Sequence, residues 1–113
     1  MENLTEDNHP PELEELDVET FAKTNPPTKE KPHARFYIIR IDRETKRVKE
    51  SSLTGEQILQ LVNKTPQTHK LFQKFRGGQT VVVEPQEVIS FIQAGVERFQ
   101  TIPKDTTEGA SLV

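Results

Sequence analysis

The segment ARFYIIRID, from Ala34 to Asp42, constrains the fold more than any other part of the chain. Apolar residues fall on both of its alternating faces, and β-branched isoleucines are prominent among them. A strand with two partly apolar faces is typical of the middle of a sheet, whereas an edge strand usually alternates with polar residues. We therefore predict a central strand here, and the rest of the chain must supply the sheet around it.

The residues that follow predict a hairpin. Asp42-Arg43-Glu44-Thr45 is a turn sequence, and KRVKESS continues as a second, more polar strand. Its charges are typical of a strand near the edge of a sheet, where they discourage pairing with other chains.

A helix is expected next. Thr54 is a favourable N-cap, and Gln57 lies three residues later, where it completes a capping box. Pro66 ends the helix, because the residue before a proline is disfavoured in the α region. The helix has one apolar face, which must pack on a sheet; this face comprises Ile58, Leu59, Leu61 and Val62.

The second half of the chain predicts more strands. HKLFQKFR, from His69 to Arg76, alternates, and Gly77-Gly78 separates it from the strand-like TVVVEP. Two glycines between two such runs indicate a two-residue hairpin, since primed turns need positive φ. EVISF is a short extended segment, Ala94-Gly95 forms a turn, and VERFQTI, from Val96 to Ile102, is the last strand.

This order of elements indicates an α+β fold with one helix packed across a mixed sheet. If the last strand pairs beside the first, in the middle of the sheet, the fold is the β-grasp that ubiquitin has. We expect this domain to span residues 34–103, followed by a flexible C-terminal tail over residues 104–113.

The start of the chain has a different composition. Residues 1–34 hold nine acidic residues, three lysines and five of the eight prolines, whereas the remainder has a net charge of +3. Low hydrophobicity with high charge is typical of disorder, so we predict a disordered acidic tail over residues 1–33. PPELEELDVETFAK could instead form a short helix that begins at Pro11 and folds on a partner.

Several classes of function are disfavoured by composition. The chain has no cysteine, which excludes disulfides and thiolate chemistry. We expect no metal, since His9, His33 and His69 lack ligand spacing, and we expect no catalytic residues, no cofactor and no enzymatic activity. No apolar run is long enough to cross a bilayer and the start is not a signal peptide, so a cytoplasmic location without membrane contact is expected.

Four stretches together resemble the bacterial multiubiquitin-type ubiquitin-like domain: FYIIRIDRETKRV, TGEQILQLVNKTP, HKLFQKFRGG and GVERFQTIPKD. The most specific parts are IRIDRE at residues 39–44, FRGG at residues 75–78 and GVERF at residues 95–99. The likeness covers about residues 35–104, in a single copy. Such domains occur with ubiquitin-activating, ubiquitin-conjugating and JAMM-type peptidase homologues, so the resemblance implies these enzymes as partners.

The resemblance implies a protein modifier whose C-terminal glycine is joined to amines of target proteins. Glycine suits this chemistry because a chain without a side chain can thread a narrow channel. The chain continues past Gly109 as Ala110-Ser111-Leu112-Val113. The resemblance therefore implies cleavage between Gly109 and Ala110 by the peptidase, and activation of Gly109 by an enzyme that uses ATP.

Three alternatives remain. The Arg-Gly-Gly sequence and the basic body could bind RNA, although RNA-binding RGG elements occur as repeats in disordered segments, and we expect no nucleic-acid partner. The domain could be a docking module that is never conjugated, with Ile39, Ile41, Leu71 and Phe99 either in its core or on a partner-binding surface. It could also be a sulfur carrier that uses the same C-terminal chemistry.

Overall fold

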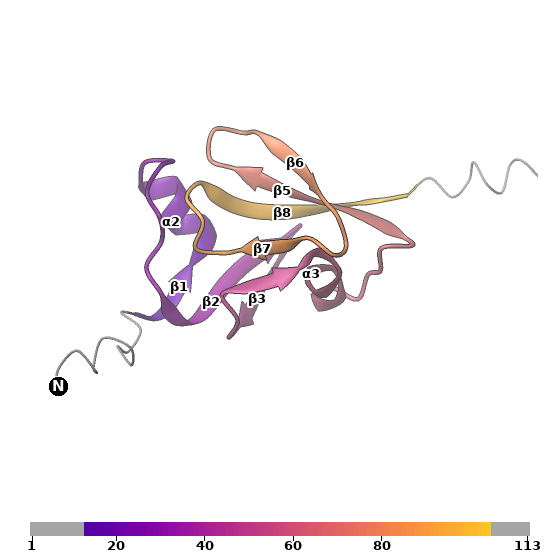
Figure 1. Ribbon diagram of the computed structural model, residues 1–113, viewed down its shortest axis with the longest axis horizontal. Coiled ribbons are helices and arrows are strands. Elements are labelled where there is room, and N and C mark those ends of the chain that lie inside the picture. Colours follow the sequence, from indigo (N-terminus) through magenta and orange to yellow (C-terminus); the bar gives the residue numbers. More distant parts are fainter. Residues whose placement is uncertain (1–12, 105–113) are drawn as a thin grey trace, which may run out of the picture.

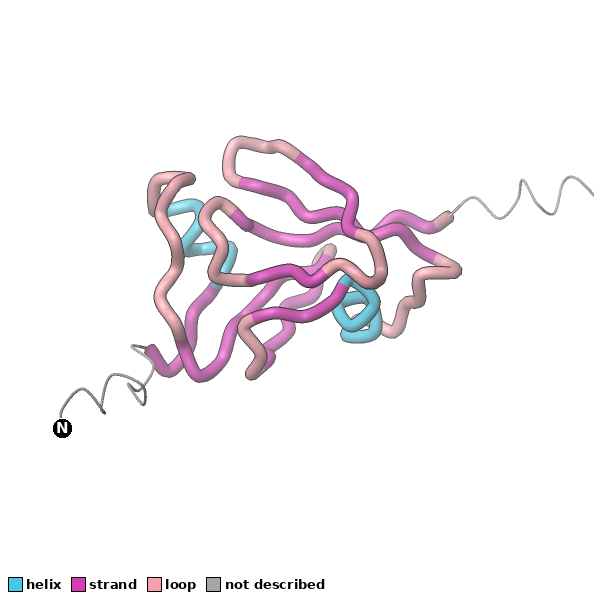
Figure 2. The backbone as a smooth tube through the Cα atoms, in the orientation of Figure 1, coloured by secondary structure: helices cyan, strands magenta, loops and turns pink. Residues whose placement is uncertain are grey.

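The computed structural model describes residues 13–104 (Figure 1). Strands dominate it, and its two helices lie at opposite ends of the strands (Figure 2). The elements are β1 Leu13–Asp17, α2 Val18–Thr24, β2 Ala34–Ile41, β3 Glu44–Val48, β4 Ser52–Thr54, α3 Gly55–Leu61, β5 His69–Phe75, β6 Thr80–Val83, β7 Val88–Ser90 and β8 Val96–Pro103.

The predicted central strand is confirmed as β2, which has three neighbours in the six-stranded sheet. Tyr37 pairs with Leu16 of β1 and with Val48 of β3, and Ile41 pairs with Glu44 of β3 and Phe99 of β8. β3 occupies one edge of β2. Along the other edge, β2 pairs first with β1 and then, only at its end, with β8.

The other half of the sheet is built on β8. This strand is antiparallel to β5 from His69↔Pro103 to Phe75↔Val96, and β5 is antiparallel to β6. The prediction that the last strand lies beside the first is confirmed, with β2 and β8 parallel. The α+β, β-grasp-like architecture expected from the sequence is therefore present.

Helix α3 begins as its local sequence predicts, but it ends at Leu61, before Pro66 is reached, and Asn63 just beyond it has a positive φ of 60°. The Thr54 hydroxyl accepts a hydrogen bond from the Gln57 backbone N–H, and the Gln57 side chain accepts one from the Thr54 N–H. Before the helix, Ser52–Thr54 forms β4, which pairs with β7 in a separate two-stranded sheet. The sequence does not predict β4, because Thr54 and Gln57 indicate only the start of the helix.

The core lies between the main sheet and α3. Phe91, from the turn after β7, is completely buried between Tyr37 and Phe99, with ring centroids 6.4 Å and 6.0 Å away. Ile58 and Leu59 of α3 complete the same cluster. These residues come from segments that extend from Tyr37 to Phe99 in the sequence, so the core depends on long-range contacts.

The prediction of a disordered tail over residues 1–33 is wrong for residues 13–33, whereas residues 1–12 lie outside the described part. Residues 13–17 form β1, and Asp17, not Pro11, caps α2 by accepting a hydrogen bond from Thr20 N–H at 3.0 Å. Leu16, Val18 and Ala22 are 5%, 0% and 4% exposed. The segment has too few apolar residues to fold alone, but the sheet supplies the surface that buries them.

The Gly77-Gly78 hairpin is confirmed, but its connection is longer than two residues. The turn comprises Arg76–Gln79, where Phe75 N–H donates to Gln79 O at 2.8 Å and both glycines have φ of 100°. The Arg76 guanidinium donates to the backbone oxygens of Ala22, at 2.7 Å, and Asn25. The turn therefore contacts the C-terminal end of α2.

Candidate functional site

The C-terminal exit of the domain is the first candidate site. Strand β8 ends at Pro103, and Lys104 N–H donates to Thr68 O at 2.9 Å, which attaches the last described residue to the loop before β5. The described chain therefore ends at one end of the sheet (Figure 1).

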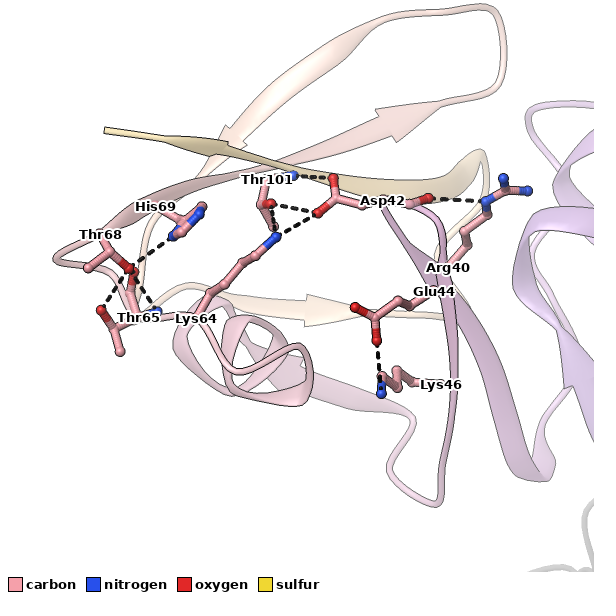
Figure 3. A network of polar contacts seen from close by, with 9 residues as sticks. All are labelled: Arg40, Asp42, Glu44, Lys46, Lys64, Thr65, Thr68, His69 and Thr101. Atoms are coloured by element: carbon pink, nitrogen blue, oxygen red, sulfur yellow. Dashed lines mark hydrogen bonds and ion pairs between the residues drawn. The ribbon is translucent and has the colours of Figure 1, made fainter. Parts of the chain in front are cut away.

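A polar network fixes β8 just before the exit (Figure 3). The Asp42 carboxylate accepts hydrogen bonds from Thr101 N–H at 2.8 Å and Thr101 Oγ1 at 2.6 Å. Lys64 Nζ lies 3.2 Å from the same carboxylate and 2.9 Å from Thr101 Oγ1. The network thus joins the β2–β3 turn and the segment after α3 to β8.

Asp42 is suited to this position by its backbone and its charge. Its φ of 56° is in the left-handed region, which Asp and Asn adopt more readily than most residues. Partial burial acts to raise the pKa of Asp42, but the hydrogen bonds from Thr101 and the hydrogen bond and charge of Lys64 outweigh it and lower the pKa below its ordinary value. The carboxylate is therefore charged at neutral pH and accepts the hydrogen bonds.

The loop beside the exit has its own hydrogen bonds. Thr68 Oγ1 lies 3.1 Å from Thr65 Oγ1 and 2.9 Å from His69 Nδ1, and His69 N–H donates to Thr65 O (Figure 3). His69, the first residue of β5, thus forms hydrogen bonds with the turn before it, and within residues 13–104 there is no cluster of metal-ligating residues around it or elsewhere.

The predicted site residues are not brought together by the structure. Gly109 and Ala110 lie outside the described residues. The four predicted partner-binding residues lie in the core: Ile39, Ile41, Leu71 and Phe99, of which none is more than 2% exposed. The interpretation of these four as a partner surface is wrong, because their side chains point to the side of the sheet that α3 and Phe91 cover.

The opposite face of β5, β6 and β8 carries apolar surface that the sequence does not predict. Phe72 is half-buried there, paired with Val82 and Gln100, and Ile102 is 50% exposed opposite Lys70. The alternation along β5 separates Phe72 from Leu71, but without the sheet topology it does not tell which of them faces outward. The neighbouring basic side chains are Lys70, Lys74 and Arg98.

A pocket of about 210 Å³ lies at the end of this sheet, where α3, β5 and β6 meet. Its apolar lining includes Leu59, Leu71 and Val83, and its charged lining is Lys70, Lys104 and Glu84. The pocket therefore adjoins the C-terminal exit. No helix within residues 13–104 is long and apolar enough to span a membrane.

One comparison with known proteins found a match. The model of a family described as Multiubiquitin matches residues 37–104, from the middle of β2 to the C-terminal exit. No curated protein matches the chain, and no solved structure matches it. The family match includes the Asp42 network and the pocket but not β1 or α2.

Proposed function

The chain belongs to the Multiubiquitin family and contains a ubiquitin-like domain, and from this premise we propose that it is a protein modifier attached to target amines through Gly109. The observation that supports the proposal is the position of the C-terminal exit. The chain leaves β8 at the end of the sheet, and five residues separate Lys104 from Ala110. Gly109 and Ala110 thus follow the last described strand in the sequence, which supports cleavage between them by a peptidase.

The proposed reaction sequence assigns the chemistry to partner enzymes. A JAMM-type peptidase hydrolyses the Gly109–Ala110 bond and frees the Gly109 carboxylate. A ubiquitin-activating-like enzyme joins this carboxylate to AMP from ATP, with release of pyrophosphate, and its cysteine then displaces AMP to form a thioester. After transfer to a ubiquitin-conjugating-like enzyme, a target amine displaces the thiol and an amide bond forms.

The experiment that tests the proposal is intact-mass measurement after co-expression with a peptidase and an activating enzyme of these classes. We expect loss of Ala110-Ser111-Leu112-Val113 and a Gly109-dependent adduct on other proteins. Gly109→Ala should abolish the adduct, and Ser111→Ala is the matched control that should leave it unchanged, because Ser111 is in the released peptide.

Truncated chains separate the steps. A chain that ends at Gly109 should form adducts without the peptidase, and a chain that ends at Glu108 should form none. An unchanged mass, together with full function of Gly109→Ala, would contradict the proposal and favour the unconjugated docking module. A thiocarboxylate at Gly109 in place of an adduct would indicate the sulfur carrier.

A further inference from the structure

Strand β6 differs from the other outer strands of the main sheet. β1 and β3, with the sequences LEELD and ETKRV, are rich in charge, which protects a sheet edge from pairing with other chains. β6 has the sequence TVVV and no charge, and it pairs only with β5. Figure 1 shows it as the outermost strand on its side of the sheet.

The free edge of β6 is accessible. Val81 and Val82 are 36% and 40% exposed, and no described residue pairs with the side of β6 that faces away from β5. An open strand edge presents unpaired N–H and C=O groups, which an added strand can satisfy. The β-branched residues favour the extended conformation that such pairing needs.

The pocket described above lies at the C-terminal end of this edge. Val82 and Val83 of β6 line it, and Leu59 and Leu71 supply further apolar surface. A strand added to β6 would pass this opening, and one of its side chains could enter the pocket. The volume of about 210 Å³ suits an aliphatic side chain better than a larger ligand.

The charges beside the edge indicate the partner. Lys70 and Lys104 line the pocket together with one acid, Glu84, and Lys74 lies further along β5 on the same face as Lys70. Acidic residues flanking the added strand would complement these lysines. Pairing of two β6 edges would instead bring the lysines of both copies onto one face, which disfavours a second copy as the occupant.

We propose that the β6 edge binds an extended, acidic and aliphatic peptide of a partner protein by strand addition, with one aliphatic side chain in the adjoining pocket. The backbone pairing supplies affinity, and the pocket and lysines supply selectivity. This inference does not depend on conjugation at Gly109, because the edge and the pocket are present in the chain as it is.

The test uses the full chain and a fluorescein-labelled peptide in which two aspartates precede Val-Ile-Val-Thr-Val. We expect saturable binding, with changes in the NMR amide signals centred on residues 80–84. Val82→Lys should weaken binding by about tenfold or more, because it places a charge at the edge. Val88→Lys is the matched control, since Val88 is 65% exposed on β7 and its replacement should leave binding unchanged.

Charge and backbone are tested separately. The double variant Lys70→Glu, Lys104→Glu should weaken binding, whereas Lys49→Glu should have little effect. A peptide in which proline replaces the central valine should not bind, because it lacks a backbone donor. Equal affinity for a peptide with lysines in place of aspartates, absence of changes at residues 80–84, or dimerisation through β6 in light scattering would each overturn the proposal.

Discussion

Lys31 is an unusual residue for the body of a small domain. It is only 4% exposed, and its Nζ donates to Gln93 O at 2.7 Å. Burial lowers the pKa of Lys31 to about 8, because the charged amine is poorly solvated there. The folded protein therefore keeps a charge in an unfavourable place at neutral pH. Lys31 is also too buried to accept a modifier in the folded state.

Replacement of Lys31 by methionine should raise the free energy of unfolding at pH 7 by about 1 kcal/mol. The folded pKa of about 8 lies below the ordinary 10.5, so the unfolded chain binds the proton more tightly and wild-type stability rises as pH increases between these values. Lys31→Met should lack this rise. Urea unfolding across this range measures it, with Lys49→Met, at an exposed position, as the control. An equal rise in the Lys31 variant would contradict the prediction.

Asp42→Asn should lower the free energy of unfolding by about 1–2 kcal/mol at neutral pH, because charge-assisted hydrogen bonds to Thr101 and Lys64 are weakened. The asparagine keeps the left-handed turn. Since the pKa of Asp42 is lowered in the folded state, its stabilisation is complete above the ordinary value of 3.8 and is lost as pH falls through the folded pKa.

The difference in the free energy of unfolding between wild type and Asp42→Asn should therefore become smaller at acidic pH. Guanidinium unfolding at neutral and acidic pH measures this difference. Glu44→Gln is the control in the same hairpin, since the Glu44 side chain is 56% exposed and forms an ion pair with Lys46 at the surface. A difference that is independent of pH would show that the charge of Asp42 is not the cause.

At the scale of elements, the Arg-Gly-Gly turn has a structural role. Arg76 donates to the backbone oxygens of Ala22 and Asn25 at the C-terminal end of α2, where unpaired carbonyls and the helix dipole favour a cation. The arginine that suggested RNA binding is thus used within the molecule. The glycines supply the positive φ that brings it there.

Arg76→Ala should destabilise the protein by about 1 kcal/mol, because two carbonyl oxygens of the α2 end lose their donor. The measurement is the thermal midpoint together with hydrogen exchange of α2 amides, which should become faster. Arg35→Ala is the control, because the Arg35 side chain is 61% exposed and pairs with Glu14 at the surface. An unchanged exchange rate in α2 would contradict the assigned role.

Gly55→Ala should be destabilising by about 1–3 kcal/mol, although alanine is the better helix former. A Cβ at Gly55 would lie 2.4 Å from Glu84 O and 3.0 Å from Val83 Cγ1, so the start of α3 would have to move away from β6. Denaturant unfolding measures the loss. Gln60→Ala, on the exposed face of α3, is the control and should change the free energy of unfolding little. If Gly55→Ala has an equally small effect, the contact between Gly55 and the Glu84 backbone is not tight.

The elements differ in how far the sequence predicts them. α3 and the β5–β6 hairpin follow from local signals, the Thr54–Gln57 capping box and the two glycines. β1 and α2 escape such signals because three residues, Leu16, Val18 and Ala22, are buried only by surfaces supplied from elsewhere. The sequence likewise does not predict that Ile39 is buried and that Phe72 lies on the outer face. Alternation along a strand identifies its two faces but not which of them the core covers.

At the scale of the whole molecule, β1 and α2 complete a divided sheet. β2 and β8 pair only at Ile41↔Phe99, and α2 packs against both strands where they diverge. The Multiubiquitin match begins at residue 37 and so excludes this unit. The domain of this chain therefore includes an N-terminal part that the family match does not cover.

Deletion of residues 1–24 should lower the free energy of unfolding by about 3 kcal/mol or more, because the burial of Leu16, Val18 and Ala22 against the rest of the domain is lost. Deletion of residues 1–12 is the comparison, since it removes acidic residues but keeps β1 and α2. Circular dichroism melting and NMR signal dispersion report the result. Equal stability of the two truncated chains would contradict an integral role for this unit.

The arrangement of β1, β2 and β8 also determines how the domain bears mechanical load. The three strands run parallel, and the described chain begins and ends at opposite ends of the molecule (Figure 1). A pull between residues 13 and 104 therefore acts along the strands and shears their hydrogen bonds together instead of opening them one by one. A pull on Lys104 would first load its bond to Thr68 O and the pairing of the end of β8 with β5, and then the Asp42–Thr101 bonds, which connect β8 to the turn after β2.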